Sequence, residues 1–223
     1  MPEGIKIMAK NLEREVVVHA GEIRLQGILG LPPEAIGAIA FAHGSGSGRF
    51  SPRNNYVARL LQDAGLATLL FDLLEEYEET DRRKVFDIGL LAERLLIGTR
   101  WLQNTPGTRG LKLGYFGAST GAAAALQAAA REPESVSAIV SRGGRPDLAV
   151  DYLDNVKAPT LLIVGGEDRQ VISMNKEAFK SLKGVKDLVI VPGASHLFEE
   201  PGTLDKVAKI ALDWFLKYIS PEK

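Results

Sequence analysis

A serine with a glycine two positions before it and another two positions after it is the feature of this sequence that most plainly suggests chemistry. Gly117, Ser119 and Gly121 form a G-x-S-x-G pattern between an apolar run at residues 111–116 and an alanine-rich run at residues 122–130. In such a turn a strand reverses sharply into a helix, so the serine is strained and the flanking positions have no room for side chains. The pattern predicts an exposed, nucleophilic serine.

A serine nucleophile needs a base, and the sequence offers few candidates. Where a strand, a sharp turn and a helix present the serine, the catalytic groups follow the chain order serine, acid, histidine. The chain has three histidines, His19, His43 and His196, and only His196 follows Ser119. It also lies on a glycine-containing loop after the apolar run 188–191, where a predicted strand ends. We therefore predict that His196 is the base.

Asp168 is the predicted acid partner of His196. It follows a strand-like apolar run at residues 160–164 and two glycines, which places its side chain near the ends of the other strands. Glu167 is the alternative, but the shorter side chain of aspartate is the commoner partner of a histidine Nδ1. Two structural roles compete with the catalytic one for Asp168: the N-cap of a helix and a solvated loop position.

The loop after the predicted strand at residues 36–42 offers hydrogen-bond donors. Residues 43–48 (HGSGSG) are small, so their backbone N–H groups can face a ligand, and the loop is similar to the His-Gly oxyanion loop of esterases. We expect the backbone N–H groups of Ser45 and Thr120 to form an oxyanion hole. His43 is then expected to be a structural residue of the loop.

The same glycine-rich loop, together with Asp72 at the end of the next predicted strand, also suggests dinucleotide binding. The spacing argues against that function, because Arg49 stands where the third glycine of the motif would be. The sequence has no G-x-x-x-x-G-K-[ST] run and no pair of histidines at metal-ligand spacing. We expect neither a cofactor nor a metal ion.

Four stretches of the sequence resemble dienelactone hydrolase-like members of the α/β-hydrolase superfamily. They are residues 41–55, 114–125, 141–147 and 192–201. The resemblance spans nearly the whole chain and implies an α/β-hydrolase fold. Dienelactone hydrolase itself uses a cysteine nucleophile, whereas this chain has no cysteine, so Ser119 has to take that role.

The periodicity of the chain agrees with an α/β fold. An opening hairpin is predicted at residues 15–20 and 23–31. Continuous apolar runs then predict buried parallel strands at residues 36–42, 66–71, 111–116, 136–141, 159–164 and 188–191. Helices are predicted between and after them, at residues 52–63, 82–104, 120–131, 174–182 and 204–218.

Composition fits a compact enzyme. With 223 residues, of which 45% are hydrophobic and 25% charged, the chain is predicted to form a single domain over residues 1–223. A net charge of −1 argues against nucleic acid or an anionic membrane as a partner. The first 15 residues contain no long hydrophobic core, which predicts a cytoplasmic protein without a signal peptide. The sequence leaves open whether it is a monomer or a homodimer.

The substrate pocket is expected to be open. The link between the strands at residues 136–141 and 159–164, the usual site of an inserted lid, is too short for a cap domain. The acidic run at residues 75–79 is either a rim of the site or a solvated loop. The apolar residues nearest the motif ends, which we expect to line the acyl pocket, are Phe50, Leu73, Leu74 and Phe198.

Arg142 and Arg145 follow a predicted strand, on the same edge of the sheet as Ser119. They are predicted either to bind a substrate carboxylate or to fix the loops by pairing with Asp72 or Asp147, and pairing is the commoner role.

The sequence therefore predicts a serine hydrolase that cleaves small carboxylic esters through an acyl-enzyme intermediate. A thioesterase, a peptidase or a perhydrolase would use the same three catalytic groups. A non-catalytic receptor for small molecules is a further alternative on this fold, although a binder gains nothing from a strained serine.

Overall fold

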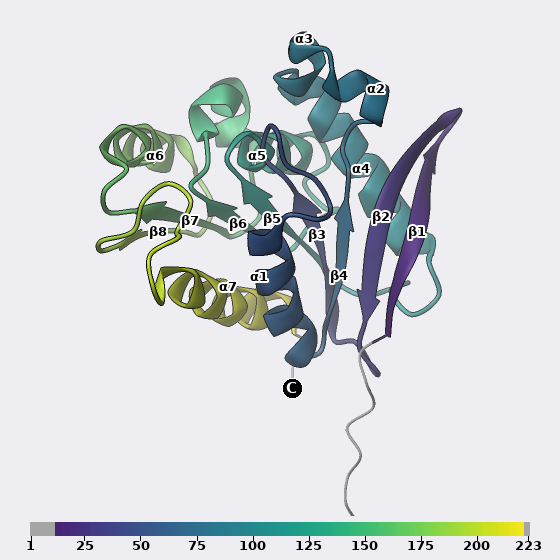
Figure 1. Ribbon diagram of the computed structural model, residues 1–223. Helices are drawn as coiled ribbons and strands as arrows, with labels where there is room; N and C mark the ends of the chain where they lie inside the picture. The colour runs from purple at the N-terminus through teal and green to yellow at the C-terminus, as the bar shows by residue number, and fades with distance from the viewer. Residues whose placement is uncertain (1–11, 221–223) are drawn as a thin grey trace, which may run out of the picture.

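A computed structural model describes residues 12–220 of the chain. Within these residues, an eight-stranded sheet runs through the centre of the molecule (Figure 1). Its strands are, in chain order, β1 (Leu12–Ala20), β2 (Ile23–Leu31), β3 (Gly37–Ala42), β4 (Leu66–Phe71), β5 (Leu113–Ala118), β6 (Ala138–Arg142), β7 (Thr160–Gly165) and β8 (Lys186–Val191).

The order of the strands across the sheet is β1-β2-β4-β3-β5-β6-β7-β8. β1 and β2 form an antiparallel hairpin, and β2 also pairs antiparallel with β4. The pairings from β4 across to β8 are parallel. Because the carboxyl ends of parallel strands meet at one edge of a sheet, the loops that follow these strands gather there. The predicted fold class, a mostly parallel α/β sheet with an N-terminal antiparallel hairpin, is confirmed.

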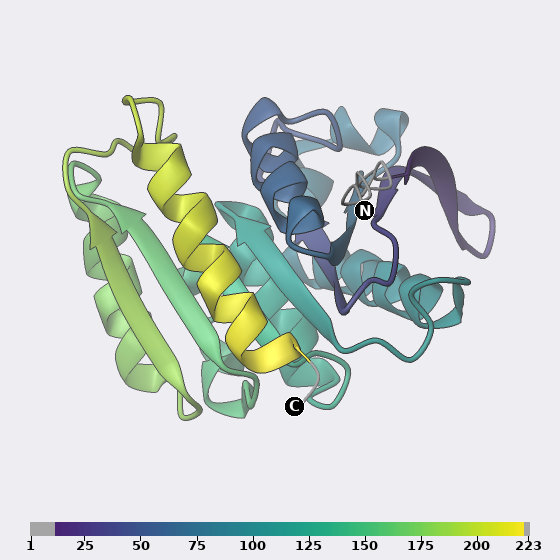
Figure 2. The ribbon, with the colours of Figure 1, turned by 90° about the horizontal axis from the view of Figure 1, so that it is seen from below.

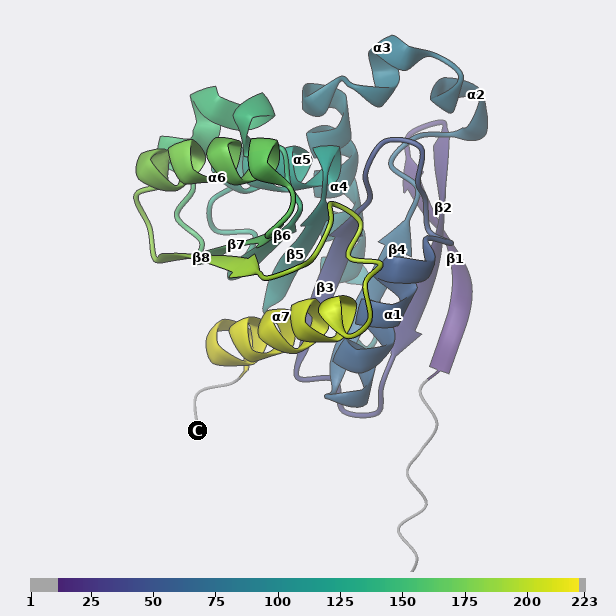
Figure 3. The same ribbon diagram turned by 60° about the vertical axis from the view of Figure 1, so that its left-hand side comes forward.

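Helices cover both faces of the sheet. One face carries α1 (Pro52–Asp63) and α7 (Thr203–Ile219), which lie in front of the sheet in Figure 2. The opposite face carries α4 (Ile88–Asn104), α5 (Thr120–Arg131), α6 (Arg169–Ser181) and the 3-10 helix η1 (Pro146–Asn155) (Figure 3). Two short helices, α2 (Glu76–Glu79) and α3 (Arg82–Val85), lead into α4 at the top of Figure 1.

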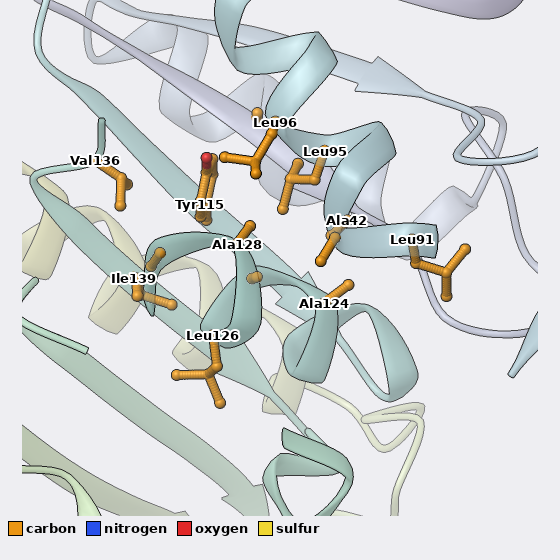
Figure 4. Close-up of a cluster of buried hydrophobic side chains, with 14 of the residues drawn as sticks. Ala42, Leu91, Leu95, Leu96, Tyr115, Ala124, Leu126, Ala128, Val136 and Ile139 are labelled. Atoms are coloured by element: carbon orange, nitrogen blue, oxygen red, sulfur yellow. The ribbon is translucent and has the colours of Figure 1, made fainter. Parts of the chain in front are cut away.

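The central strands are apolar on both sides because both faces of the sheet are covered. All residues of β3, β4, β5 and β7 are buried. On the α4 and α5 side, Leu95 and Tyr115 pack near alanines of α5, such as Ala124, whose short side chains let the helix approach the sheet closely (Figure 4). On the other side, aromatic residues such as Phe116 and Phe215 fill the space beneath α1 and α7.

Two predicted helices have different boundaries in the structure. The predicted helix at residues 82–104 is divided into α3 and α4, because the side chain of Asp87 caps α4 by accepting the Leu90 N–H at 2.9 Å. The last helix before β8 was predicted from residue 174, but α6 begins at Arg169, directly after Asp168. Asp168 therefore stands at the start of a helix.

The acidic run at residues 75–79 is not simply a solvated loop. It forms α2, and Glu78 is buried against Lys84 at 2.9 Å and Arg94 at 3.5 Å. Burial alone would raise the pKa of Glu78, but the hydrogen bond from Lys84 and the neighbouring positive charges lower it overall. This ion cluster fastens α2 to α3 and α4.

The link from β6 to β7 holds only η1 and short turns, as its length predicted. None of the helices within residues 12–220 is both long enough and apolar enough to cross a membrane.

Candidate active site

Ser119 occupies a sharp turn between β5 and α5. Its backbone has φ 51° and ψ −120°, a left-handed conformation that a residue with a side chain rarely adopts. A Cβ atom at Gly117 would lie 2.5 Å from the Cα of Ala122, and one at Gly121 would lie 2.1 Å from the carbonyl oxygen of Ala42. The two glycines are therefore required for the chain to pass this turn, and the turn has the strain that the G-x-S-x-G pattern predicted.

His196 and Asp168 are joined by a hydrogen bond. The distance from His196 Nδ1 to Asp168 Oδ2 is 2.6 Å. Asp168 stands at the N-cap position of α6, yet its side chain makes no capping hydrogen bond and contacts the histidine instead. An ionised carboxylate only accepts hydrogen bonds, so Nδ1 carries the proton and the lone pair of Nε2 is left for another partner. Glu167, the alternative acid, has an exposed side chain.

Two neighbouring loops hold Ser119 and His196 at the same edge of the sheet. The Ser119 N–H donates to the carbonyl oxygen of Arg142 at 3.2 Å. The next residue, Gly143, lies against the imidazole, since a Cβ at this position would be 3.5 Å from the Nδ1 and Cε1 atoms of His196. The Ser119 hydroxyl makes no hydrogen bond to any residue in the range 12–220, so the serine and the imidazole are not hydrogen-bonded in this structure.

His43 lies inside the loop after β3 and is buried. Its Nε2 accepts the backbone N–H of Leu73 at 3.0 Å, which requires the proton to be on Nδ1. Nδ1 in turn lies 3.0 Å from the carbonyl oxygen of Gly44. The histidine thus ties the loop after β3 to the segment after β4, which is the kind of structural role that the sequence predicted.

The expected oxyanion donors lie close together, but with a contact that the sequence did not suggest. The backbone N–H of Ser45 donates to the side-chain hydroxyl of Thr120 at 2.9 Å. Thr120 directly follows Ser119 and is almost fully buried. In this structure the Ser45 N–H is therefore already engaged by the hydroxyl of Thr120.

A small cavity of about 110 Å³ opens beside this contact. Thr120 and the loop at residues 43–47 form its polar wall, and Leu74, Val85 and Leu91 form its apolar wall, with Glu79 at the side. Leu74 was expected in the pocket from the sequence. Val85 and Leu91 were missed, because they come from α3 and α4, which lie well away from the motifs in the sequence.

The other expected pocket residues lie elsewhere. Phe50 is 63% exposed, with the Arg49 guanidinium 4.2 Å from its ring centre. Leu73 and Phe198 are both buried in the two hydrophobic cores. None of these three side chains lines the cavity beside Thr120. Leu73 differs from its neighbour Leu74 because the side chains of adjacent residues point in different directions.

The sequence model of the Dienelactone hydrolase family matches residues 57–219 of this chain. The chain belongs to this family. Among solved structures, the dienelactone hydrolase from Anabaena variabilis ATCC 29413 is 58% identical, with a TM-score of 0.91 over 95% of this chain and 100% of that one. Est1E from Butyrivibrio proteoclasticus is 17% identical, with a TM-score of 0.79 over 91% of this chain and 98% of that one, and shows a shared fold.

Two relatives from Mycobacterium tuberculosis, strains CDC 1551 and H37Rv, are provisionally named as phosphoribosyl transferases. Each is 56% identical to this chain over 207 residues, which are 93% of this chain and 47% of the relative. The chain thus spans about half the length of these two relatives.

The arginines of this family member do not behave alike. Arg145 forms a two-pronged contact with Asp147, with Nε and Nη2 at 2.9 and 2.8 Å from its carboxylate oxygens. Arg49 pairs with Asp72, whose Oδ1 also accepts the Arg49 N–H at 2.7 Å. Both pairs brace loops. Arg142 is buried and has no carboxylate partner among the described residues.

Proposed function

We propose that this protein hydrolyses small carboxylic esters, with Ser119 as the nucleophile. The observation that carries the proposal is the hydrogen bond between Asp168 and His196 at the sheet edge that also holds Ser119 in its strained turn. A binding protein would have no use for a serine held in this way beside an oriented imidazole. Membership of the dienelactone hydrolase family supports hydrolysis as the class of reaction.

The geometry supports a double-displacement reaction. Ser119 Oγ attacks the ester carbonyl while its proton passes to His196 Nε2. The imidazolium then gives that proton to the departing alcohol, which leaves an acyl group on Ser119. A water molecule then attacks the acyl carbon while His196 Nε2 takes its proton, and the imidazolium returns that proton to Ser119 Oγ as the acid is released. Throughout these steps Asp168 keeps the proton of the resting imidazole on Nδ1 and stabilises the imidazolium.

The transferase name of the mycobacterial relatives belongs to proteins about twice as long as the matched segment. In this chain the matched segment contains the turn at Ser119 and the Asp168–His196 pair, an arrangement suited to attack by an oxygen nucleophile on an acyl carbon. Hydrolysis of p-nitrophenyl esters, measured by absorbance, tests the proposal directly. The absence of turnover with esters of every chain length would contradict it.

Thr120 is proposed to donate its hydroxyl proton to the oxyanion, in addition to its backbone N–H. A hydroxyl group has one proton and two lone pairs. One lone pair of Thr120 Oγ1 accepts the Ser45 N–H, and its proton has no acceptor among the described residues. Polarised by Ser45, this proton is available to a carbonyl oxygen in the cavity that Thr120 lines.

Thr120→Val is therefore expected to lower kcat by about 10²-fold, the effect of losing one oxyanion donor, with little change in KM. Thr120→Ser keeps the hydroxyl and is expected to retain most of the activity. Steady-state kinetics with p-nitrophenyl acetate and a thermal unfolding scan measure both effects. If valine and serine variants are equally active, the oxyanion hole consists of backbone N–H groups alone.

The cavity also predicts a preference for short acyl chains. A volume of about 110 Å³ equals roughly four water-sized groups at ~30 Å³ each. We expect acyl chains of about two to six carbons to react faster than lipid-length chains, since each methylene gains about 0.8 kcal/mol only where apolar surface covers it.

Val85→Phe narrows the cavity and should lower the rate ratio of butyrate to acetate esters about tenfold. Val185→Phe, at an exposed position outside the cavity, is the matched control.

A further inference from the structure

Residues from three of the stretches that carry the family resemblance, at positions 53, 54, 142 and 199, meet on the face of the sheet covered by α1. Arg53 and Asn54 lie in the first turn of α1, and Arg142 ends β6. The Arg142 Nη2 atom lies 3.4 Å from the side-chain oxygen of Asn54. Arg53 reaches Glu199 at 3.2 Å, in the loop after His196. We call Arg53, Asn54 and Arg142 the arginine cluster.

Three hydrogen-bond donor atoms of the arginine cluster are buried and have no partner among the described residues. Arg142 is only 8% exposed, and its Nε and Nη1 atoms are buried without an acceptor in the part of the chain that the structure describes. The Nε atom of Arg53 is buried and unpartnered as well. Buried donors in folded proteins are nearly always satisfied, so three such atoms on two adjacent guanidinium groups require an explanation.

Within residues 12–220, the cluster has one paired carboxylate, that of Glu199, and it contacts Arg53 rather than Arg142. Burial, together with the positive charge of Arg53, lowers the pKa of Arg142 to about 10, which still leaves the side chain protonated at neutral pH. Glu199 pairs with Arg53 from the solvent side, where its side chain is 63% exposed. Within the part of the chain that the structure describes, Arg142 is left as a buried cation without a carboxylate partner, an arrangement that proteins avoid. Water would satisfy its donors but would not neutralise its charge.

We propose that the arginine cluster binds a small oxyanion, such as a carboxylate or phosphate group. Guanidinium groups present several N–H donors in one plane and match the oxygens of these ions. Arg145 and Arg49 show the contrast, because each already has an aspartate from this chain on its guanidinium group. The ion comes from solution because none of the described residues supplies a carboxylate to Arg142.

The position of the cluster gives the ion a structural link to the catalytic loops. The carbonyl oxygen of Arg142 accepts the Ser119 N–H, and the next residue, Gly143, lies against His196. On the other side, Arg53 contacts the loop that follows His196. An ion held between β6 and α1 therefore joins the two segments that position the candidate nucleophile and base, without being part of the cavity beside Thr120.

Thermal unfolding in a buffer of low anion content, with inorganic phosphate as the probe, tests this site. Phosphate is expected to raise the Tm of the wild-type protein with the logarithm of its concentration above Kd, by about 3 °C or more at ten times Kd, whereas chloride at equal ionic strength raises it less. Arg142→Met removes the buried charge, so its Tm without phosphate should equal or exceed that of the wild type. Its Tm should not respond to phosphate. Arg109→Met, which removes an exposed arginine elsewhere, should keep the full response.

Kinetics then identify the source of the oxyanion. If it is the acid group of the substrate, phosphate competes with an ester that carries a free carboxylate but not with a neutral ester. If it is a free ion, phosphate raises the Tm and leaves the KM of both esters unchanged. Should Arg142→Met not fold, Arg53→Met and calorimetric titration of the wild type with phosphate replace it.

Equal Tm shifts with phosphate and chloride, or equal Tm shifts of the wild type and Arg142→Met, would overturn the proposal. The arginine cluster would then be hydrated by water and would not bind an oxyanion. The Tm measurement requires no turnover, so its outcome is independent of whether the protein hydrolyses esters.

Discussion

Replacement of Ser119 by alanine is expected to lower the kcat of ester hydrolysis by about 10³-fold or more and to leave the fold intact. The substitution removes one oxygen atom that makes no hydrogen bond within residues 12–220, so little stability depends on it. The backbone strain at φ 51° is the same for alanine as for serine. Steady-state kinetics and circular dichroism of the purified variant measure the two effects.

Ser173→Ala is the matched control, because Ser173 is an exposed serine on α6 outside the candidate site. A fluorophosphonate reagent should modify Ser119 in the wild type and no residue in Ser119→Ala. A folded Ser119→Ala protein with undiminished turnover, or a covalent adduct on another serine, would remove the nucleophile from the proposed mechanism.

The turn at Ser119 could be predicted from the sequence because its constraints are local. The two glycines are needed to clear backbone atoms close to Ser119, and the strand and helix that flank it appear as adjacent apolar runs. The parallel strands were predicted for a similar reason, since burial on both faces leaves a continuous apolar run in the sequence. Their boundaries differ from the prediction by a few residues at most.

Contacts between distant segments could not be predicted in this way. The bond between Ser45 and Thr120 spans 75 positions and depends on the rotamer of one threonine. The apolar wall of the cavity depends on how α3 and α4 turn toward the loop after β3. Leu73 and Leu74 are equally near the motif in the sequence. In the structure, however, Leu73 is buried in the core, whereas Leu74 lines the cavity.

The arginines show the same division between local and distant information. Arg145 and Asp147 are two positions apart at the start of η1, and the sequence placed this pair among its alternatives. Arg142 depends on α1, whose Asn54 is 88 positions away, and no sequence pattern indicates that it lacks a carboxylate. The charge balance of a buried residue becomes visible only when all the elements around it are in place.

Replacement of His196 by alanine is expected to lower kcat by about 10⁵-fold or more, because no other described side chain is hydrogen-bonded in a way that prepares it to accept the serine proton. Asp168→Asn is expected to cost less, about 10⁴-fold. An asparagine amide can donate to Nδ1, which would force the proton onto Nε2 and remove the lone pair that accepts the proton of Ser119. The base would remain present but mostly in the wrong tautomer.

Glu167→Gln provides the control for the acid, since it makes the same chemical change at the neighbouring position. The side chain of Glu167 is exposed, and the hydrogen bond of this residue to the carbonyl oxygen of Ala194 comes from its backbone N–H, which the substitution retains. Full activity is therefore expected for Glu167→Gln, measured as kcat with p-nitrophenyl acetate beside Asp168→Asn. The reverse result, a harmless Asp168→Asn and an inactive Glu167→Gln, would mean that the loop rearranges during turnover. The 2.6 Å contact between Asp168 and His196 would then belong to a resting state only.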